Sequence, residues 1–254
     1  DGRKWQPFAN GIGTNSAVYI NCVHTWDSDG AGPLPAQLII GGHFAIQGNY
    51  IERWDTATQD WAALGLGMNN DLRCLTTWDP DGNGPIQPQL IAGGDFTMAG
   101  GTIVNCIARW DGSNWQPLGT GVRDTRGGYR PYVAALAIYN GELIAGGQFI
   151  KAGGVTANHI AGWDGTSWHP LGLGMNAWAL AITVHNGELI VGGTFTAVGG
   201  VSTYGLARWD GTTWRPLGSG MNDAVGALAV YNGELIAGGG FTTAGGASAN
   251  CIAR

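Results

Sequence analysis

Residues 225–241 read Val-Gly-Ala-Leu-Ala-Val-Tyr-Asn-Gly-Glu-Leu-Ile-Ala-Gly-Gly-Gly-Phe, so that Asn232 and Gly233 separate two apolar runs. An Asn-Gly pair in this setting is the strongest short signal for a β-hairpin, because a type I′ turn needs two residues at positive φ. The closing Gly-Gly-X-Phe occurs five times, at intervals of 46 to 53 residues. Such a period is typical of repeat architectures, so each copy predicts one unit of a larger assembly. The copies begin at Gly41, Gly93, Gly146, Gly192 and Gly238.

Two further strands are expected after each hairpin. A glycine-rich loop leads to an apolar run such as residues 105–110, Asp111-Gly112 predicts another tight turn, and a fourth strand holds Trp115. Four short antiparallel strands, repeated five times, predict an all-β chain that forms one five-bladed β-propeller. The expected blades span about 16–66, 72–120, 132–173, 178–219, and 224–254 together with 1–8.

The two ends of the chain are complementary. Residues 250–254 match residues 105–109, and residues 1–7 match residues 111–117. We therefore expect the N-terminal segment to supply the outer strand of the fifth blade, which would close the ring and leave no blade incomplete.

These repeats resemble known propeller families. The diglycine that ends the second strand and the tryptophan of the fourth resemble kelch-type propellers. The longer pattern Ala-Gly-Gly-X-Phe-Thr, then Asn-X-Ile-Ala-Arg-Trp-Asp-Gly-X-X-Trp-X-Pro-Leu-Gly, is similar to repeats in large bacterial surface proteins and in the ectodomains of fungal cortical bud-site markers. The architecture also resembles the tachylectin-type five-bladed lectins. The resemblance implies a propeller and an extracellular or cell-surface location, but fold alone implies no particular chemistry.

Composition excludes some partners. Charged residues make up 12% of the chain, about half the usual share, and the net charge is −6. A chain with so few cations is poorly suited to phosphate backbones, so we expect no nucleic acid partner. The apolar runs are strand-sized, so we expect no membrane insertion, and we expect a monomer. Cys106 and Cys251 are equivalent in non-adjacent units, too far apart for a disulfide, which favours free thiols.

Residues present in every unit are assigned to the scaffold. Two sets of tryptophans recur and are expected to pack between blades, and a recurring arginine is expected to be a structural partner, replaced by Gly162 in the third unit. The first tryptophan set is Trp5, Trp61, Trp115, Trp168 and Trp214, the second is Trp54, Trp110, Trp163 and Trp209, and the arginines are Arg53, Arg109, Arg208 and Arg254.

Positions that differ between the units are the candidates for function. In propellers, the loops after the second strand and before the first strand share one face around the central channel. The X of Gly-Gly-X-Phe is, in order, His43, Asp95, Gln148, Thr194 and Gly240. The residue before the inner strand is Tyr19, Asp71, Tyr132, Trp178 and Ala224, and two positions further on come Asn21, Arg73, Ala134, Leu180 and Gly226.

An inserted loop supports the choice of this face. Residues 122–132 form a connection several residues longer than its counterparts, and it carries Arg123, Arg126, Tyr129 and Arg130. Arginine side chains bind carboxylates, sulfates or phosphates in a bidentate manner, so this loop predicts positive charge near Arg73. The alternative is a solvated loop without a ligand.

Three functions remain open. The first is a binding module for a glycan, a small anion or a peptide, with Trp178 as the main stacking surface. The second is a structural or adhesive module of a larger surface protein. The third is a hydrolase or lyase in which His43 and Asp95, at equivalent positions of adjacent blades, act as a base and its orienting acid, or as two ligands of an incomplete metal site.

Two acidic loops are candidates for a calcium site. They lie on the face opposite the one that is expected to carry the variable positions. Asp27 and Asp29 in unit one and Asp79 and Asp81 in unit two replace the Asn-Gly hairpin turn. Calcium prefers six to eight oxygen ligands, and these loops lack the distal glutamate of an EF-hand. A solvated turn is the preferred interpretation, with a calcium site as the alternative, and no other cofactor is expected.

Overall fold

The computed structural model of the 254-residue chain describes all residues except 1–3, 5–7, 9–10, 13–17, 31, 45–48, 83 and 125–127. The described part is all-β and contains antiparallel strands but no helix. It therefore has no helix of the length and apolar character needed to cross a membrane.

Each sequence repeat forms one small antiparallel sheet, which we call a unit and number from one to five. Neighbouring strands in the sheet are also consecutive in the repeat, apart from short two-residue hairpins. Unit one comprises β1 (Tyr19–Trp26), β2 (Gln37–His43), β3 (Ile51–Asp55) and β4 (Asp60–Ala63). Unit two comprises β5 (Leu72–Trp78), β6 (Gln89–Gly94), β9 (Ile107–Trp110) and β10 (Trp115–Pro117).

The remaining units repeat this order, and unit five has three strands among the described residues. Unit three comprises β12 (Tyr132–Tyr139), β13 (Glu142–Gln148), β16 (Ile160–Trp163) and β17 (Trp168–Pro170). Unit four comprises β18 (Ala179–His185), β19 (Glu188–Gly193), β22 (Leu206–Trp209) and β23 (Trp214–Pro216). Unit five comprises β24 (Val225–Tyr231), β25 (Glu234–Gly239) and β28 (Ile252–Ala253).

In units two to five the glycine-rich loops form small two-stranded hairpins of their own. They comprise β7 (Met98–Ala99) with β8 (Thr102–Ile103), β14 (Lys151–Ala152) with β15 (Val155–Thr156), β20 (Ala197–Val198) with β21 (Val201–Ser202), and β26 (Thr243–Ala244) with β27 (Ala247–Ser248). A further strand, β11 (Val122–Arg123), pairs with β14.

The Asn-Gly hairpins are confirmed. Asn232 and Gly233 have φ values of 50° and 79°, as a type I′ turn requires, and the corresponding pairs in units three and four do the same. In all five units the inner strand carries a bulge after its first residues, for example between Val225 and Ala227. In unit two the bulged residue is Arg73, which lies between Leu72 and Cys74 and is exposed.

The core lies between the units rather than within them. One buried cluster joins Ile91 and Ile107 of unit two to Leu143, Phe149 and Trp163 of unit three. The phenylalanine of Gly-Gly-X-Phe is buried in every unit, so the diglycine and the phenylalanine are scaffold, as expected. No unit could bury this apolar surface alone, which is the physical reason for the repetition.

The tryptophan pairs connect successive units. Trp115 packs on Trp110 at 5.3 Å between ring centroids, and its indole N–H donates to the carbonyl oxygen of Leu64 in the preceding unit at 3.0 Å. Trp168 and Trp214 make the same bond to Leu118 and Leu171, at 2.8 and 2.7 Å. The prediction that these tryptophans pack between units is confirmed for the pairs of units two, three and four. Trp54 and Trp61 of unit one pack instead on residues of their own unit and on Phe8.

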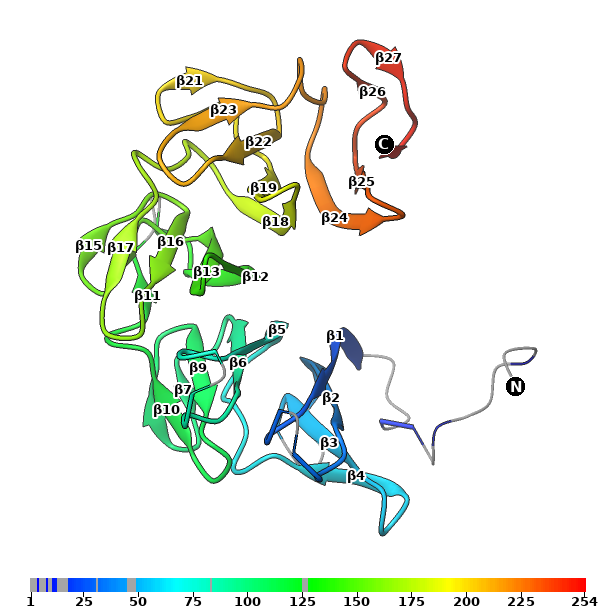
Figure 1. The fold of residues 1–254 in the computed structure, drawn as a ribbon, viewed down its shortest axis with the longest axis vertical. Helices are drawn as coiled ribbons and strands as arrows, with labels where there is room; N and C mark the ends of the chain where they lie inside the picture. The colour runs from blue at the N-terminus through cyan, green and yellow to red at the C-terminus, as the bar shows by residue number, and fades with distance from the viewer. Residues whose placement is uncertain are drawn as a thin grey trace.

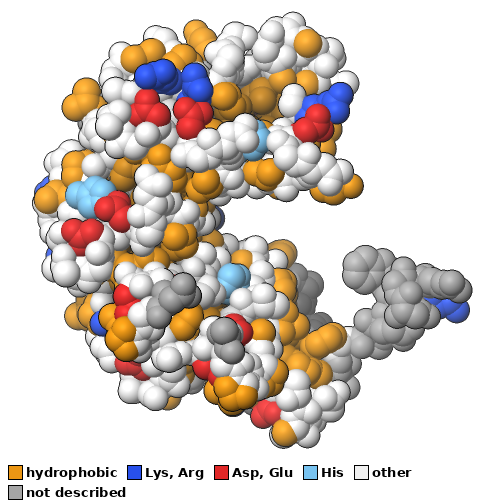
Figure 2. Space-filling view, in the orientation of Figure 1, with side chains coloured by type: hydrophobic (Ala, Val, Ile, Leu, Met, Phe, Trp, Pro, Cys, Tyr) orange, Lys and Arg blue, Asp and Glu red, His pale blue; other side chains and the backbone are white. Residues whose placement is uncertain are grey.

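The five units follow one another along an arc (Figure 1). The inner strands β1, β5, β12, β18 and β24 lie on its concave side, and consecutive inner strands contact one another from β1 to β24. The arc is open between units five and one (Figure 2), so the structure shows no closed ring. The strand predicted to close it falls on residues 1–8, most of which lie outside the described part of the chain.

Both ends of the arc present apolar side chains. Tyr231 and Val230 on β24 are 67% and 44% exposed, and Tyr19 and Val23 on β1 are 60% and 63% exposed. In units two to four the corresponding strands are mostly buried or half-buried because a neighbouring unit covers them. Surface of this kind at a unit boundary requires a partner.

Candidate functional site

The variable positions meet at one edge of the arc, as the repeat predicts. The first residues of each inner strand pair with the end of the second strand, so that Tyr19 lies opposite His43 and Tyr132 opposite Gln148. In unit two the X residue, Asp95, comes directly after the second strand. Its amide donates a hydrogen bond to the carbonyl oxygen of Asp71, the residue before the inner strand, at 2.9 Å. Backbone pairing therefore places both sets of side chains side by side.

Two pairs of a basic and an acidic side chain occupy the edge in units one and two. Nδ1 of His43 lies 2.5 Å from Oδ1 of Asp71, which belongs to the next unit. Arg73 donates to both carboxylate oxygens of Asp95, through Nε and through Nη2, the latter at 3.0 Å. The hydrogen bond to Asp95 raises the pKa of Arg73. Within each pair, the acidic side chain has a basic partner at hydrogen-bonding distance.

Aromatic side chains continue the row into units three and four. The guanidinium carbon of Arg73 lies 4.3 Å from the ring centroid of Tyr132, a cation–π geometry. Tyr132 meets Trp178 edge-on at 6.3 Å, and the Trp178 side chain is exposed. Burial raises the pKa of Tyr132, so its hydroxyl stays protonated at neutral pH. We call this set the mouth row: Tyr19, His43, Asp71, Arg73, Asp95, Tyr132 and Trp178.

Other predicted site residues lie elsewhere. Gln148 is 5% exposed, so its side chain has little surface to offer a ligand. Thr194 is exposed but lines a separate pocket between units four and five. Arg123, Tyr129 and Arg130 are exposed on the long loop, and Arg126 lies outside the described residues.

The structure rearranges the predicted acid–base pair. His43 and Asp95 occupy equivalent positions, but Asp95 pairs with Arg73 and His43 pairs with Asp71. The reason is geometric, since the residue before the next inner strand lies between the two X positions. Arg73 is also less available to an anionic ligand than the sequence suggested, because two of its nitrogens already donate to the carboxylate of Asp95.

The acidic loops are organised as turns. One carboxylate oxygen of Asp29 accepts the amide of Leu34 at 2.9 Å, and Asp81 accepts the amide of Ile86 at 3.1 Å. In the part of the chain that the structure describes, no three histidine, cysteine or acidic side chains are grouped as a metal site would require. These carboxylate–amide hydrogen bonds support the interpretation of both loops as turns. Calcium binding stays an alternative prediction.

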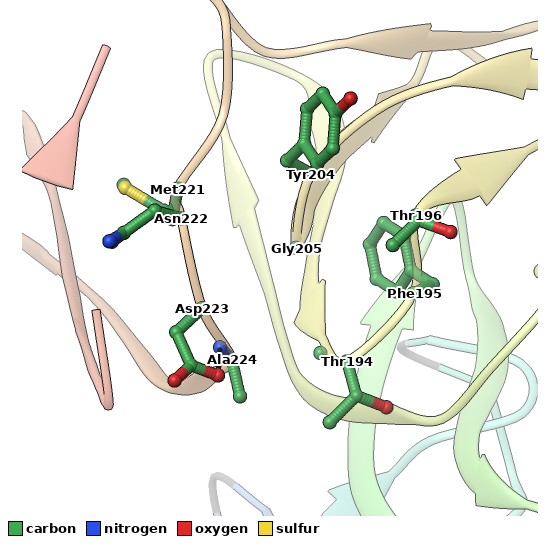
Figure 3. A pocket seen from close by; sticks show the side chains of 10 residues that line it. Thr194, Phe195, Thr196, Tyr204, Gly205, Met221, Asn222, Asp223 and Ala224 are labelled. Carbon is green, nitrogen blue, oxygen red and sulfur yellow. Dashed lines mark hydrogen bonds between the residues drawn. The ribbon is translucent and has the colours of Figure 1, made fainter. Parts of the chain in front are cut away.

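Two cavities were not anticipated from the sequence. One, of about 170 Å³, is lined by Thr194, Tyr204, Gly205 and Asp223 (Figure 3). The other, of about 460 Å³, lies on unit five between Leu217, Gly218 and Gly245. The first occurs where Gly205 replaces a residue with a side chain, so a position-by-position alignment of the repeats contained its signal.

Comparisons with known proteins concern the fold. A family model described as a domain of unknown function (DUF5122) beta-propeller matches residues 186–209, from the Asn-Gly turn of unit four to the end of β22. No curated protein matches the chain. The match and the repeated sheets identify the fold as a β-propeller.

Two solved structures have a similar fold. One is described as the extracellular domain of the putative hybrid two component system BT4673 from B. thetaiotaomicron, and the other as that of the putative one component system BT4673 from the same organism. The TM-scores are 0.52 and 0.53, with 11% and 12% sequence identity. In both cases 81% of this chain is covered, but the chain spans only 25% of the other protein, so the likeness concerns the fold alone.

Proposed function

We propose that this chain is a ligand-binding module and that its ligand, a glycan, lies along the mouth row. The observation that carries the proposal is the arrangement of these seven side chains across four units. The His43–Asp71 and Arg73–Asp95 pairs stand beside aromatic rings, of which those of Tyr19 and Trp178 are exposed to solvent. The row therefore combines hydrogen-bonding groups with a surface for stacking.

A glycan suits this chemistry better than a small anion. An anion would need unpaired cations, but Arg73 already donates to Asp95 and stacks on Tyr132. Sugar hydroxyls can donate to the outer lone pairs of Asp71 and Asp95 and accept from the remaining N–H groups of Arg73. A sugar ring can pack on the exposed part of Trp178. Arg123 and Arg130 would favour an acidic sugar among the candidates.

Binding of glycans by the Trp178→Ala variant tests this proposal. We expect the intact protein to bind a subset of an immobilised glycan library, and the variant to lose at least tenfold in affinity because the stacking surface is removed. Tyr231→Ala is the matched control, since Tyr231 is also an exposed aromatic residue but lies at the far end of an inner strand. Equal binding by all three proteins would refute the site.

The proposed module is a closed five-bladed ring, and three observations support closure by the N-terminal segment. The ring centroid of Phe8 lies 4.2 Å from that of Trp54 and 5.6 Å from that of Trp61, both in unit one. Leu118, the equivalent of Phe8 in unit two, packs on the tryptophan pair of unit three in the same way. The buried indole N–H of Trp61 has no partner among the described residues. The equivalent N–H of Trp168 donates to the carbonyl oxygen of Leu118, and the position equivalent to Leu118 before unit one is Phe8. Residues 1–7 should therefore precede unit one as the outer strand of unit five.

The second cavity is the place for that strand. Gly218 and Gly245 have open space around them, although the equivalent glycines elsewhere lie against tryptophans. The equivalents of Gly218 in units one to three lie against the tryptophan pair of the following unit, and the equivalents of Gly245 in units two to four lie against one tryptophan of their own unit. The cavity next to Gly218 and Gly245, about 460 Å³, is lined by Leu206, Leu217 and Leu235. Trp5, the first-set tryptophan expected in unit five, would fill this cavity, and its indole N–H would donate to the carbonyl oxygen of Leu217.

An extracellular location is part of the proposal. The solved structures of similar fold are described as extracellular domains, and the sequence resembles repeats of surface proteins. A structural or adhesive role is the second candidate, because the apolar surfaces of β1 and β24 could instead contact neighbouring molecules.

A further inference from the structure

Units four and five enclose a small pocket that the mouth row does not use. Its volume is about 170 Å³, and Gly205, Tyr204 and Thr194 of unit four face Asp223 across it. Figure 3 shows Tyr204 at one end of the pocket, Asp223 and Thr194 at the other, and Gly205 between them. The side chains of Met221 and Asn222 point away from it (Figure 3).

The pocket exists because Gly205 has no side chain. The equivalent residues of the other units adopt the same left-handed conformation, with φ between 70° and 73°, yet each carries a side chain: Tyr50, Cys106, His159 and Cys251. Gly205 has φ 64°. A residue other than glycine is therefore compatible with this backbone, and its absence in unit four leaves a space that is filled at the other boundaries between described units.

The walls of the pocket are hydrogen-bond acceptors. In unit two the thiol of Cys106 donates to Pro131 O at 3.2 Å, and burial raises the pKa of this thiol to about 12, which keeps its proton in place. In unit three Nδ1 of His159 donates to Gly147 O at 3.2 Å. The carbonyls of Asp223 and Gly193 are the counterparts of these two acceptors, and residue 205 supplies no donor to either.

Both carbonyl oxygens border the empty position. Asp223 O and Gly193 O lie 3.1 and 3.2 Å from the point that a Cβ of residue 205 would occupy. The carboxylate of Asp223 uses Oδ1 to accept the amide of Ala224 at 2.7 Å and forms no ion pair within the described residues. The pocket thus combines two carbonyls, one carboxylate and the Thr194 hydroxyl with no cation.

We propose that this pocket binds a primary ammonium group. An ammonium carries three N–H donors and one positive charge, which matches two carbonyls and one carboxylate. A divalent metal ion fits less well, because calcium takes six to eight oxygen ligands and the pocket offers one acidic side chain. Tyr204 would contact the alkyl group that carries the amine. The site is separate from the mouth row, so it does not depend on the glycan proposal.

Titration of the intact chain with methylammonium chloride, followed by ¹H–¹⁵N NMR, tests the proposal. We expect saturable shifts at the amides of Gly193, Gly205 and Ala224. Tetramethylammonium and sodium chloride at the same ionic strength should produce no saturable shift, because neither supplies an N–H donor. Equal shifts with tetramethylammonium or sodium would overturn the proposal.

Two variants locate the binding, and a third serves as control. Gly205→Cys fills the pocket with the side chain used in unit two, and Asp223→Asn removes the charge, so each should weaken methylammonium binding at least tenfold. Asp79→Asn removes a carboxylate from a distant turn and should bind as the unmodified protein does. Undiminished binding by both pocket variants would overturn the site. Asp223 is exposed, so we expect Asp223→Asn to unfold at the same temperature as the unmodified protein, and a loss of binding in this variant then reports on the site rather than on the fold.

The source of the amine can be separated in the same titration. Tighter binding of an N-acetylated, C-amidated lysine than of methylammonium would assign the site to a lysine side chain of a peptide. Weaker binding would assign it to a small free amine.

Discussion

Single residues show how the repeat tolerates change. The recurring arginine pairs with the first residue of the second strand in units two, four and five, as Arg208 does with Glu188 at 3.0 Å, and its predicted structural role is confirmed there. Unit three lacks the arginine, and His169 on the adjacent strand pairs with Glu142 at 3.0 Å instead. The sequence showed the loss at Gly162 but not the replacement, because the compensating residue lies across the strand pair, opposite Gly162.

Restoring the arginine tests this compensation. A Cβ at residue 162 would lie 2.5 Å from the His169 ring, so we expect Gly162→Arg alone to lower the free energy of unfolding by about 1–3 kcal/mol through overpacking. Adding His169→Gln, the residue found opposite Arg109 in unit two, should recover most of the loss by rebuilding the arginine–glutamate pair. Urea unfolding measures both values. If the double variant is no more stable than Gly162→Arg, the two positions do not exchange roles.

At the scale of elements, hairpins were predictable and small accessory strands were not. The Asn-Gly and Asp-Gly turns follow from local backbone preference, so the sequence identifies them. The two-residue strands such as β7 and β8 depend on a segment from the previous unit, since Asn69 N donates to Met98 O. That contact is non-local, and the sequence predicted only a glycine-rich loop.

The turns between the third and fourth strands should make stability depend on pH. In unit three, hydrogen bonds from Ser167 and Thr166, first of all from their amides, lower the pKa of Asp164 below its ordinary value of 3.8, and Asp210 has the same environment in unit four. A carboxyl group whose pKa is lower in the folded state stabilises the fold above its unfolded pKa, and this stabilisation is lost as the pH falls below about 4.

Thermal unfolding between pH 7 and pH 3 tests the contribution of these turns. Asp164→Ala with Asp210→Ala should unfold at a lower temperature than the unmodified protein at pH 7, because the turn bonds are lost. The difference should shrink as the pH approaches 3, because these carboxyl groups bind protons in the unfolded state below about pH 4 but stay ionised in the folded state. A difference that is independent of pH would show that ionisation does not contribute.

At the scale of the molecule, the sequence predicted five repeated sheets and the edge where the variable residues meet. It did not predict which of those residues contact one another. His43 pairs with Asp71 rather than Asp95 because the relative placement of units one and two determines the contact, and no local pattern encodes that placement. The pocket at Gly205 was missed for a related reason, since it arises between two units.

Ring closure is the central claim about the whole molecule, and a disulfide can test it directly. In unit two Gln116 lies opposite Arg109, so closure places Gln6 opposite Arg254. Directly opposite residues of antiparallel strands have Cα atoms about 4.5–5.5 Å apart, which suits a disulfide. The variant Gln6→Cys with Arg254→Cys is made in a Cys251→Ser background, and Gln6→Cys with Tyr231→Cys is the control pair.

Mass spectrometry of the oxidised, non-reduced protein gives the answer. Closure predicts a bond between positions 6 and 254 within one molecule, formed at any protein concentration, and none in the control pair. Absence of that bond, or its formation only between molecules, would contradict the closed ring.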